Sequence, residues 1–151
     1  MNKLSQGIFE IDGYDFSKDT KLEEMVKLEK YRPIGRNDVK RFVSRPNMVE
    51  FFGYNFVAEF VFYYGRLSTI ELYPRLDEEY DKKHIELFHE KCFDYCKKLL
   101  DEQFDDTIKR IEDKDGIEFY FKGGTAGIPH SYYRKDYEPG GYIYVSFKNQ
   151  I

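Results

Sequence analysis

Residues 117–122 and 142–147 each alternate between two kinds of side chain, and this alternation constrains the fold more than any other feature. One set is apolar: Ile117, Phe119, Phe121, Ile143, Val145 and Phe147. The other set carries Tyr120, Tyr142 and Tyr144 with Glu118, Lys122 and Ser146. A period of two places successive side chains on opposite faces of a strand. The two segments therefore predict a sheet with one buried face and one tyrosine-bearing face.

Composition narrows the class of protein. The 151 residues suit a single domain, 1–151, with a core of its own. Aromatic residues make up 19% of the chain, as 14 Phe and 14 Tyr without Trp, and such residues favour strands. A net charge of −4 argues against nucleic-acid binding, which needs a broad basic surface. No apolar run reaches the length of a membrane span and no leader is visible, so we expect a cytoplasmic protein without membrane contact.

The middle of the chain predicts a β-hairpin formed by residues 56–62 and 66–73. A two-residue loop would put the carboxylate of Glu59 on the same face as Ile70, which is unfavourable. A three-residue loop, 63–65, instead aligns the phenylalanines of the first strand with Ile70, and its glycine can adopt the left-handed conformation that such a loop needs. The pattern therefore predicts the three-residue loop.

A long helix is predicted over Asp81–Phe104 because apolar residues recur there at spacings of three and four. This apolar stripe comprises Ile85, Phe88, Cys92, Cys96, Leu99 and Leu100. Thr20 followed by Glu23 predicts the start of a smaller N-terminal helix. The expected fold class is therefore α+β: a curved antiparallel sheet with the long helix packed on one face and the smaller helix at its edge.

Shorter strands are predicted at residues 39–43, at 48–52 and from Ile108 onward. The glycine cluster 123–127 lies at the start of a segment that we expect to be a long loop, 123–141, joining the last two strands.

The sequence contains no motif that points to catalysis or to a cofactor. His89, Cys92 and Cys96 share one helix, but three ligands within an apolar stripe make a poor tetrahedral metal site, so the cysteines are interpreted as reduced core thiols. The glycine cluster lacks the Lys-Ser/Thr pair of a phosphate loop. We therefore expect a non-enzymatic protein with neither a metal nor a cofactor.

The candidate site is the tyrosine-bearing sheet face with the long loop beside it. Tyrosine is enriched in recognition surfaces because it offers a large contact area at low entropic cost. It is also a favoured cross-strand residue on half-exposed sheets, so ordinary sheet surface is the alternative interpretation. The residues predicted to contact a partner are Glu59, Tyr63, Glu71, Tyr73, Glu118, Tyr120, Tyr142 and Tyr144 on the sheet, and Tyr132, Tyr133 and Asp136 in the loop.

The order of the segments resembles small bacterial α+β immunity-type proteins, which accompany secreted antibacterial toxins. The resemblance is carried by Phe9-Glu10-Ile11-Asp12-Gly13-Tyr14, by Asp19-Thr20-Lys21-Leu22-Glu23-Glu24, by the hairpin at Tyr64-Gly65-Arg66-Leu67, by the long helix and by the closing Gly140-Gly141-Tyr142-Ile143-Tyr144-Val145. It implies a cytosolic protein that binds one toxin domain and blocks it. No catalytic residues carry over, because such proteins act by occlusion.

Two functions from different classes follow as hypotheses. The first is a non-enzymatic immunity protein whose acidic, tyrosine-bearing face covers a basic toxin domain. The second is a small-molecule-binding or enzymatic domain with a pocket between helix and sheet. A deep apolar pocket with convergent polar groups would favour the second hypothesis, and a shallow acidic surface would favour the first.

Overall fold

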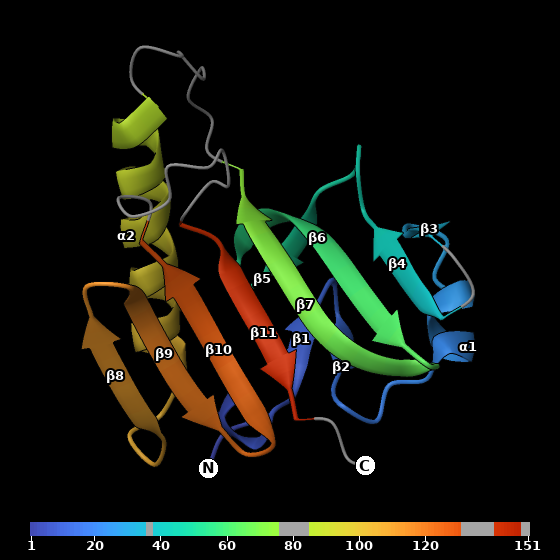
Figure 1. Ribbon diagram of the computed structural model, residues 1–151, viewed down its shortest axis with the longest axis horizontal. Helices are drawn as coiled ribbons and strands as arrows, with labels where there is room; N and C mark the ends of the chain where they lie inside the picture. Colours follow the sequence, from blue (N-terminus) through green and yellow to red (C-terminus); the bar gives the residue numbers. More distant parts are fainter. Residues whose placement is uncertain (36–37, 76–84, 131–140, 149–151) are drawn as a thin grey trace.

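A computed structural model describes residues 1–35, 38–75, 85–130 and 141–148, and antiparallel strands dominate it (Figure 1). Helical segments are few: the 3-10 turn η1 (Leu4–Gln6), α1 (Leu22–Val26) and α2 (Ile85–Gln103). The strands are β1 (Phe9–Ile11), β2 (Tyr14–Phe16), β3 (Arg32–Gly35), β4 (Val39–Val43), β5 (Val49–Phe51), β6 (Tyr54–Tyr63), β7 (Arg66–Pro74), β8 (Lys109–Asp113), β9 (Gly116–Phe121), β10 (Gly124–Pro129) and β11 (Ile143–Phe147).

The large sheet has the strand order β3-β4-β6-β7-β11-β10-β9-β8, and β5 pairs with the first part of β6. All of its pairings are antiparallel. In sequence, α2 lies between β7 and the edge strand β8, and the meander β8-β9-β10-β11 then returns until β11 pairs with β7. The predicted antiparallel sheet is therefore confirmed. Its last strand in sequence, β11, pairs with β7 in the middle of the sheet.

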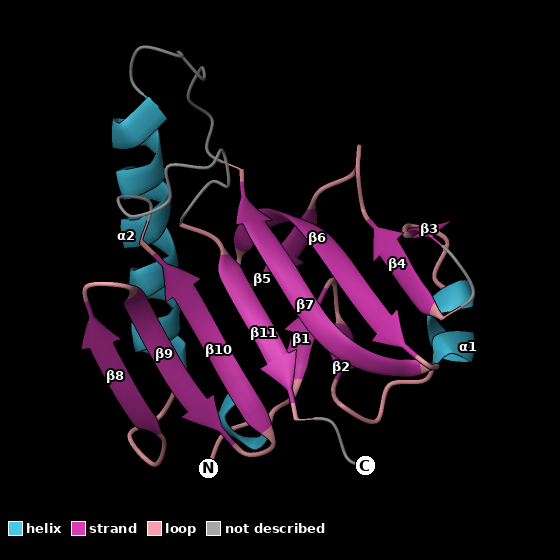
Figure 2. Cartoon of the chain, in the orientation of Figure 1, coloured by secondary structure: helices cyan, strands magenta, loops and turns pink. Residues whose placement is uncertain are grey.

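The expected α+β class, with one long helix covering a curved sheet, is wrong. Strands are the predominant secondary structure, and the N-terminal helix α1 is only five residues long (Figure 2). The helix α2 contacts the sheet mainly at β10 and β7, beside one end of the molecule. The separate two-stranded hairpin β1-β2 covers another part of the buried face, and Leu4 of η1, Met25 of α1 and Tyr31 add to the same core. The reason is that a single helix cannot cover a sheet this wide, so N-terminal strands complete the core.

Aromatic packing joins the β1-β2 hairpin to the sheet. The ring of Phe9 lies 5.3 Å from that of Phe121 and 5.9 Å from that of Phe147, both edge-on. Phe16 lies 4.5 Å from Phe60 between ring centroids. Burying each such side chain contributes about 1.5–3 kcal/mol. The hairpin is therefore part of the main core.

The helix α2 buries an apolar stripe that includes residues from Cys92 to Leu100. Cys96, Leu99 and Leu100 are buried, and Phe104 stacks on Phe119 at 4.8 Å. Burial raises the pKa of the Cys96 thiol, so it stays protonated, as expected of a core thiol. The first four residues of the predicted helix, 81–84, lie outside the described residues, as do the side chains of residues 85–89.

The middle hairpin has the predicted faces but a different turn. Tyr64 and Gly65 form a two-residue turn with positive φ angles of 49° and 78°. The register then shifts between Val61 and Phe62, where β7 carries one extra residue. This bulge, rather than a longer loop, keeps Glu59 off the buried face.

Residues 124–129 were predicted to lie at the start of a long loop, but in the structure they form the strand β10. It lies between β9 and β11, so these two strands do not pair with each other directly. Gly124 makes this possible, since a Cβ atom there would lie 2.2 Å from the Ser146 carbonyl oxygen and 2.8 Å from the Phe121 ring. Glycines weaken the sequence signal of a strand, which explains why the pattern indicated a loop.

Two glycines of β10 give a matched test of this packing. We expect Gly124→Ala to lower the free energy of unfolding by about 1–3 kcal/mol, because the added methyl group overlaps backbone and ring atoms. Gly127→Ala should change it by less than about 1 kcal/mol, because its methyl group meets nothing closer than 3.5 Å. Urea unfolding of both variants provides the measurement. Equal stability of the two would contradict the close approach at Gly124.

Candidate functional site

The outer face of the sheet is hollowed over β8, β9, β10, β11 and β7. The hollow has a volume of about 660 Å³ and is open to solvent. We call it the acidic hollow. Its lining comprises Glu71, Ile111, Asp113, Asp115, Gly116, Ile117, Glu118, Tyr120, Gly127, Ile128, Pro129, Tyr142 and Tyr144.

Gly127 gives the hollow its floor. It is the register partner of Glu118 on one side and of Tyr144 on the other. Side chains at these positions project from the same face, so a glycine between two long side chains leaves a gap. Tyr144 in turn pairs with Glu71. The two glutamates thus lie three strands apart, about 14 Å between backbones, with the gap and a tyrosine between them.

Each glutamate at the rim accepts a hydrogen bond from a tyrosine two residues along its own strand. The Tyr120 hydroxyl donates to Glu118 at 2.6 Å, and the Tyr73 hydroxyl donates to Glu71 at 2.5 Å. The bond to Glu118 raises the pKa of Tyr120. Burial, followed by the bond to Glu71, raises the pKa of Tyr73. Both hydroxyls are therefore donors at neutral pH, and the carboxylates are held in place.

The charge of the acidic hollow has one sign. Its lining contains four acidic side chains, Glu71, Asp113, Asp115 and Glu118, and no Lys or Arg. Carboxylates that line one concave surface attract cations, and tyrosine rings can accept cation–π contacts, as Tyr120 does from the Lys109 ammonium nitrogen 5.6 Å from its ring centroid. The arrangement can therefore bind guanidinium or ammonium groups through hydrogen bonds, ion pairs and ring faces.

The structure brings five of the predicted contact residues together in this hollow, and a sixth lies beside it. The five are Glu71, Glu118, Tyr120, Tyr142 and Tyr144. Tyr73 stacks on Tyr142 with ring centroids 5.0 Å apart and an interplanar angle of 21°. The sequence therefore identified the three tyrosines and two of the four carboxylates that line the hollow.

The remaining predicted residues lie elsewhere. The Glu59 side chain is 18% exposed and is held between Arg41 at 3.5 Å and Arg45 at 3.9 Å, so its charge is offset within the protein. Tyr63 is 48% exposed at the β6-β7 turn, where its ring packs on that of Tyr64. Tyr132, Tyr133 and Asp136 lie outside the described residues.

Sequence reasoning missed Asp113, Asp115 and Gly127. The two aspartates belong to a turn, in which the Asp115 backbone N–H donates to the Asp113 side chain at 2.8 Å. That turn joins β8 to β9 and therefore lies at the rim of the hollow. Gly127 could have been found by treating the glycine cluster as a strand with one open position on its outer face.

The alternative pocket between helix and sheet gains no support from the described hollows. Besides the acidic hollow, one is lined by residues of the 18–21 and 65–67 segments with Lys148, and another by residues 10–13 and 50–53. None of the three linings includes a residue of α2. Within the described ranges, no group of three His, Cys, Asp or Glu side chains could hold a metal ion.

Comparison with protein-family models, curated proteins and solved structures found no significant match. The resemblance to immunity-type proteins therefore remains a prediction. In the portion of the chain that the structure describes, no helix is long and apolar enough to cross a membrane.

The Tyr73–Glu71 contact predicts a change in alkaline stability. The folded state raises the pKa of Tyr73, so unfolding releases its proton once the pH exceeds the unfolded value of about 10. The stability that this tyrosine contributes is thus complete below that pH and is lost as the pH rises further. We expect Tyr73→Phe to be less stable than the wild type at pH 7, and to lose less stability than the wild type between pH 9 and pH 11. Urea unfolding across this range measures both, and parallel pH profiles would contradict the assignment.

Proposed function

We propose that this protein is a non-enzymatic binding protein that receives basic side chains of a protein partner in the acidic hollow. The observation that carries this proposal is the composition of the lining: four carboxylates and three tyrosines, without a cationic side chain. A surface of this kind complements a basic patch in charge, and its tyrosines supply contact area.

The breadth of the hollow supports a protein partner rather than an enclosed small ligand. Small-molecule pockets bury most of the ligand and are mainly apolar. The acidic hollow is open and spans five strands, from Asp113 on β8 to Glu71 on β7. A protruding loop with one or two Arg or Lys residues matches this shape better than a compact metabolite does.

Tyr120 and Tyr144 are the expected anchors of the interface. Tyr144 on β11 is the register partner of Gly127, and Tyr120 on β9 follows two residues after Glu118, the other partner of Gly127. The two tyrosines are 37% and 36% exposed, respectively. Partly exposed aromatic residues at the centre of a polar surface are typical of binding hot spots, because they bury a large area without losing much rotamer freedom.

The family resemblance supports a specific kind of partner. Immunity-type proteins bind the toxin encoded beside them and cover its active site, and a toxin domain that acts on nucleic acid or on other anions would be basic. The net charge of −4 is compatible with such a partner. We therefore propose an antibacterial toxin domain, neutralised by occlusion in the cytoplasm, as the partner. The product of the neighbouring gene is the candidate to test.

The central test removes both anchors. We expect Tyr120→Ala combined with Tyr144→Ala to weaken binding of the neighbouring gene's product by about 2 kcal/mol or more, since truncated aromatic hot spots commonly cost this much. Titration calorimetry measures the affinity, and a thermal melt shows that each variant is folded.

A matched control removes two tyrosines away from the hollow. Tyr63→Ala combined with Tyr64→Ala truncates a pair of exposed rings at the β6-β7 turn and should leave the affinity within about 0.5 kcal/mol. Unchanged affinity in the folded Tyr120/Tyr144 variant would exclude the acidic hollow as the interface.

Neutralising the rim should act mainly on the rate of association. We expect Glu71→Gln with Glu118→Gln to slow association about tenfold at low salt and to reduce its salt dependence, because fewer charges steer the basic partner. Glu23→Gln with Glu102→Gln makes the same change in net charge at exposed positions outside the hollow and should have a smaller effect. Surface plasmon resonance at several salt concentrations compares them. Equal slowing in both variants would show that net charge alone is responsible.

A further inference from the structure

A second hollow has the opposite charge. It has a volume of about 240 Å³, and we call it the basic cleft. Its lining comprises Lys18, Asp19, Thr20, Lys21, Gly65, Arg66, Leu67 and Lys148. Four cationic side chains and a single carboxylate thus meet in a chain whose net charge is −4.

The fold assembles this cleft from three distant segments. A β-bridge joins Lys21, just before α1, to Arg66 at the start of β7. Lys148, just after β11, donates its N–H to the Gly123 carbonyl oxygen at 2.8 Å. The Cδ atom of Lys18 lies 3.7 Å from the point where a Cβ on Gly123 would sit. The β9-β10 turn therefore holds Lys18 and Lys148 on the same side of the molecule.

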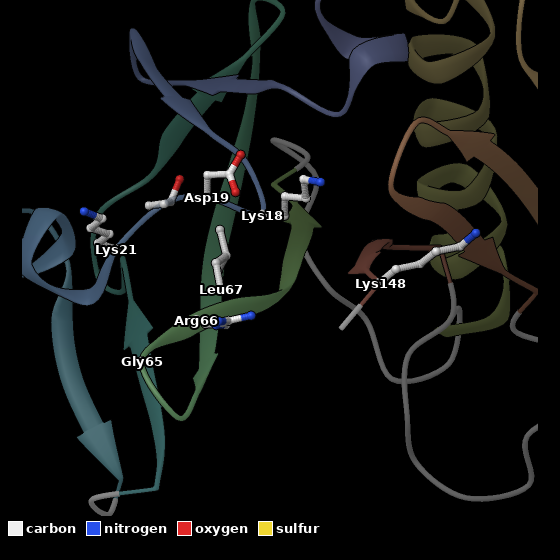
Figure 3. A pocket seen from close by; sticks show the side chains of 8 residues that line it. Lys18, Asp19, Lys21, Gly65, Arg66, Leu67 and Lys148 are labelled. Atoms are coloured by element: carbon white, nitrogen blue, oxygen red, sulfur yellow. The ribbon is translucent and has the colours of Figure 1, made fainter. Parts of the chain in front are cut away.

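Figure 3 shows how these side chains lie around the cleft. Arg66 and Lys18 extend their charged ends toward the side where Lys148 lies, whereas Lys21 extends toward the opposite side. Leu67 lies between Arg66 and the Lys18–Asp19 segment and is almost fully buried, so it forms an apolar base. The cations therefore line an elongated cleft instead of converging on one point.

The three lysines of the basic cleft differ from many other basic residues of the protein in having no ionic partner among the described residues. Cations that form ion pairs with described residues include Lys3, Lys30, Arg41, Arg45, Lys97 and Arg110. Within the described residues, Lys18, Lys21 and Lys148 have neither an ion pair nor a side-chain hydrogen bond. Like charges that gather in one cleft without internal partners repel each other, and an anion would relieve that repulsion.

We propose that the basic cleft binds a small ligand with two or more linked phosphate groups, such as inorganic polyphosphate or the phosphate chain of a nucleotide. Lysine ammonium groups bind phosphate as point charges, and cations spread along a cleft match a negative charge spread along a chain. The short cleft and its carboxylate, Asp19, favour a small ligand over a long nucleic-acid strand.

The backbone around the cleft explains why a single phosphate is a poorer match. Phosphate loops hold one phosphate with several free N–H groups. Here the Thr20 N–H donates to the Ser17 carbonyl oxygen at 3.0 Å, and the Lys21 N–H donates to the Glu24 carboxylate at 2.8 Å. Recognition therefore depends on the cationic side chains, and each added phosphate adds a contact.

This site shares no residue with the acidic hollow. The proposal is therefore independent of the protein partner, and it can be tested with the isolated 151-residue chain.

The test measures binding of sodium tripolyphosphate, ATP and orthophosphate by titration calorimetry at low ionic strength in a phosphate-free buffer. We expect tripolyphosphate and ATP to bind, and orthophosphate to bind at least about tenfold more weakly. Similar affinities for tripolyphosphate and ATP would identify the phosphate chain as the recognised group, whereas tighter binding of ATP would show that the nucleoside adds contacts. Both results support the cleft.

Matched variants locate the site. Lys18→Gln with Lys148→Gln should weaken tripolyphosphate binding about tenfold or more. Lys98→Gln with Lys114→Gln makes the same change in net charge at exposed positions outside the cleft and should weaken it much less. Equal weakening in both variants, absence of tripolyphosphate binding by the wild type, or tighter binding of a short single-stranded oligonucleotide than of tripolyphosphate would each overturn the proposal.

Discussion

The close approach of three strands at Gly124 is the constraint on which the rest of the structure depends. A side chain there would overlap the Ser146 carbonyl oxygen and the Phe121 ring, so only glycine lets β10 lie between β9 and β11. With β10 in place, the meander connects the edge strand β8 to the middle strand β7. The sheet then becomes too wide for one helix, and the β1-β2 hairpin fills the remaining core with Phe9 and Phe16.

The same strand also creates the candidate site. Gly124 faces the core, and Gly127, three residues later, faces outward between Glu118 and Tyr144. Two glycines in one strand thus serve opposite faces: one permits packing and the other leaves a hollow. The alternation of a strand explains both roles, because residues an odd number apart point to opposite sides.

The protein contains many acidic and many basic residues, and the structure gathers carboxylates and lysines in two different surface hollows. Carboxylates line the hollow over β8–β11 and β7, and lysines line the cleft formed by the 18–21 and 65–67 segments with Lys148. Elsewhere Glu59 is held between two arginines, so its charge is offset internally. Net charge therefore describes this surface poorly, and local fields decide which partner each region attracts.

The sequence by itself determined which face of each long strand is buried, because alternating Phe119, Phe121 and Val145 can meet a core on one side only. It also identified Tyr120, Tyr144, Glu71 and Glu118 as one surface. Only the tertiary structure decided that β10 is a strand and that the β6-β7 hairpin uses a bulge. It also decided that Lys18 and Lys148 share a cleft. These features depend on contacts between residues far apart in the chain, and a local pattern does not encode such contacts.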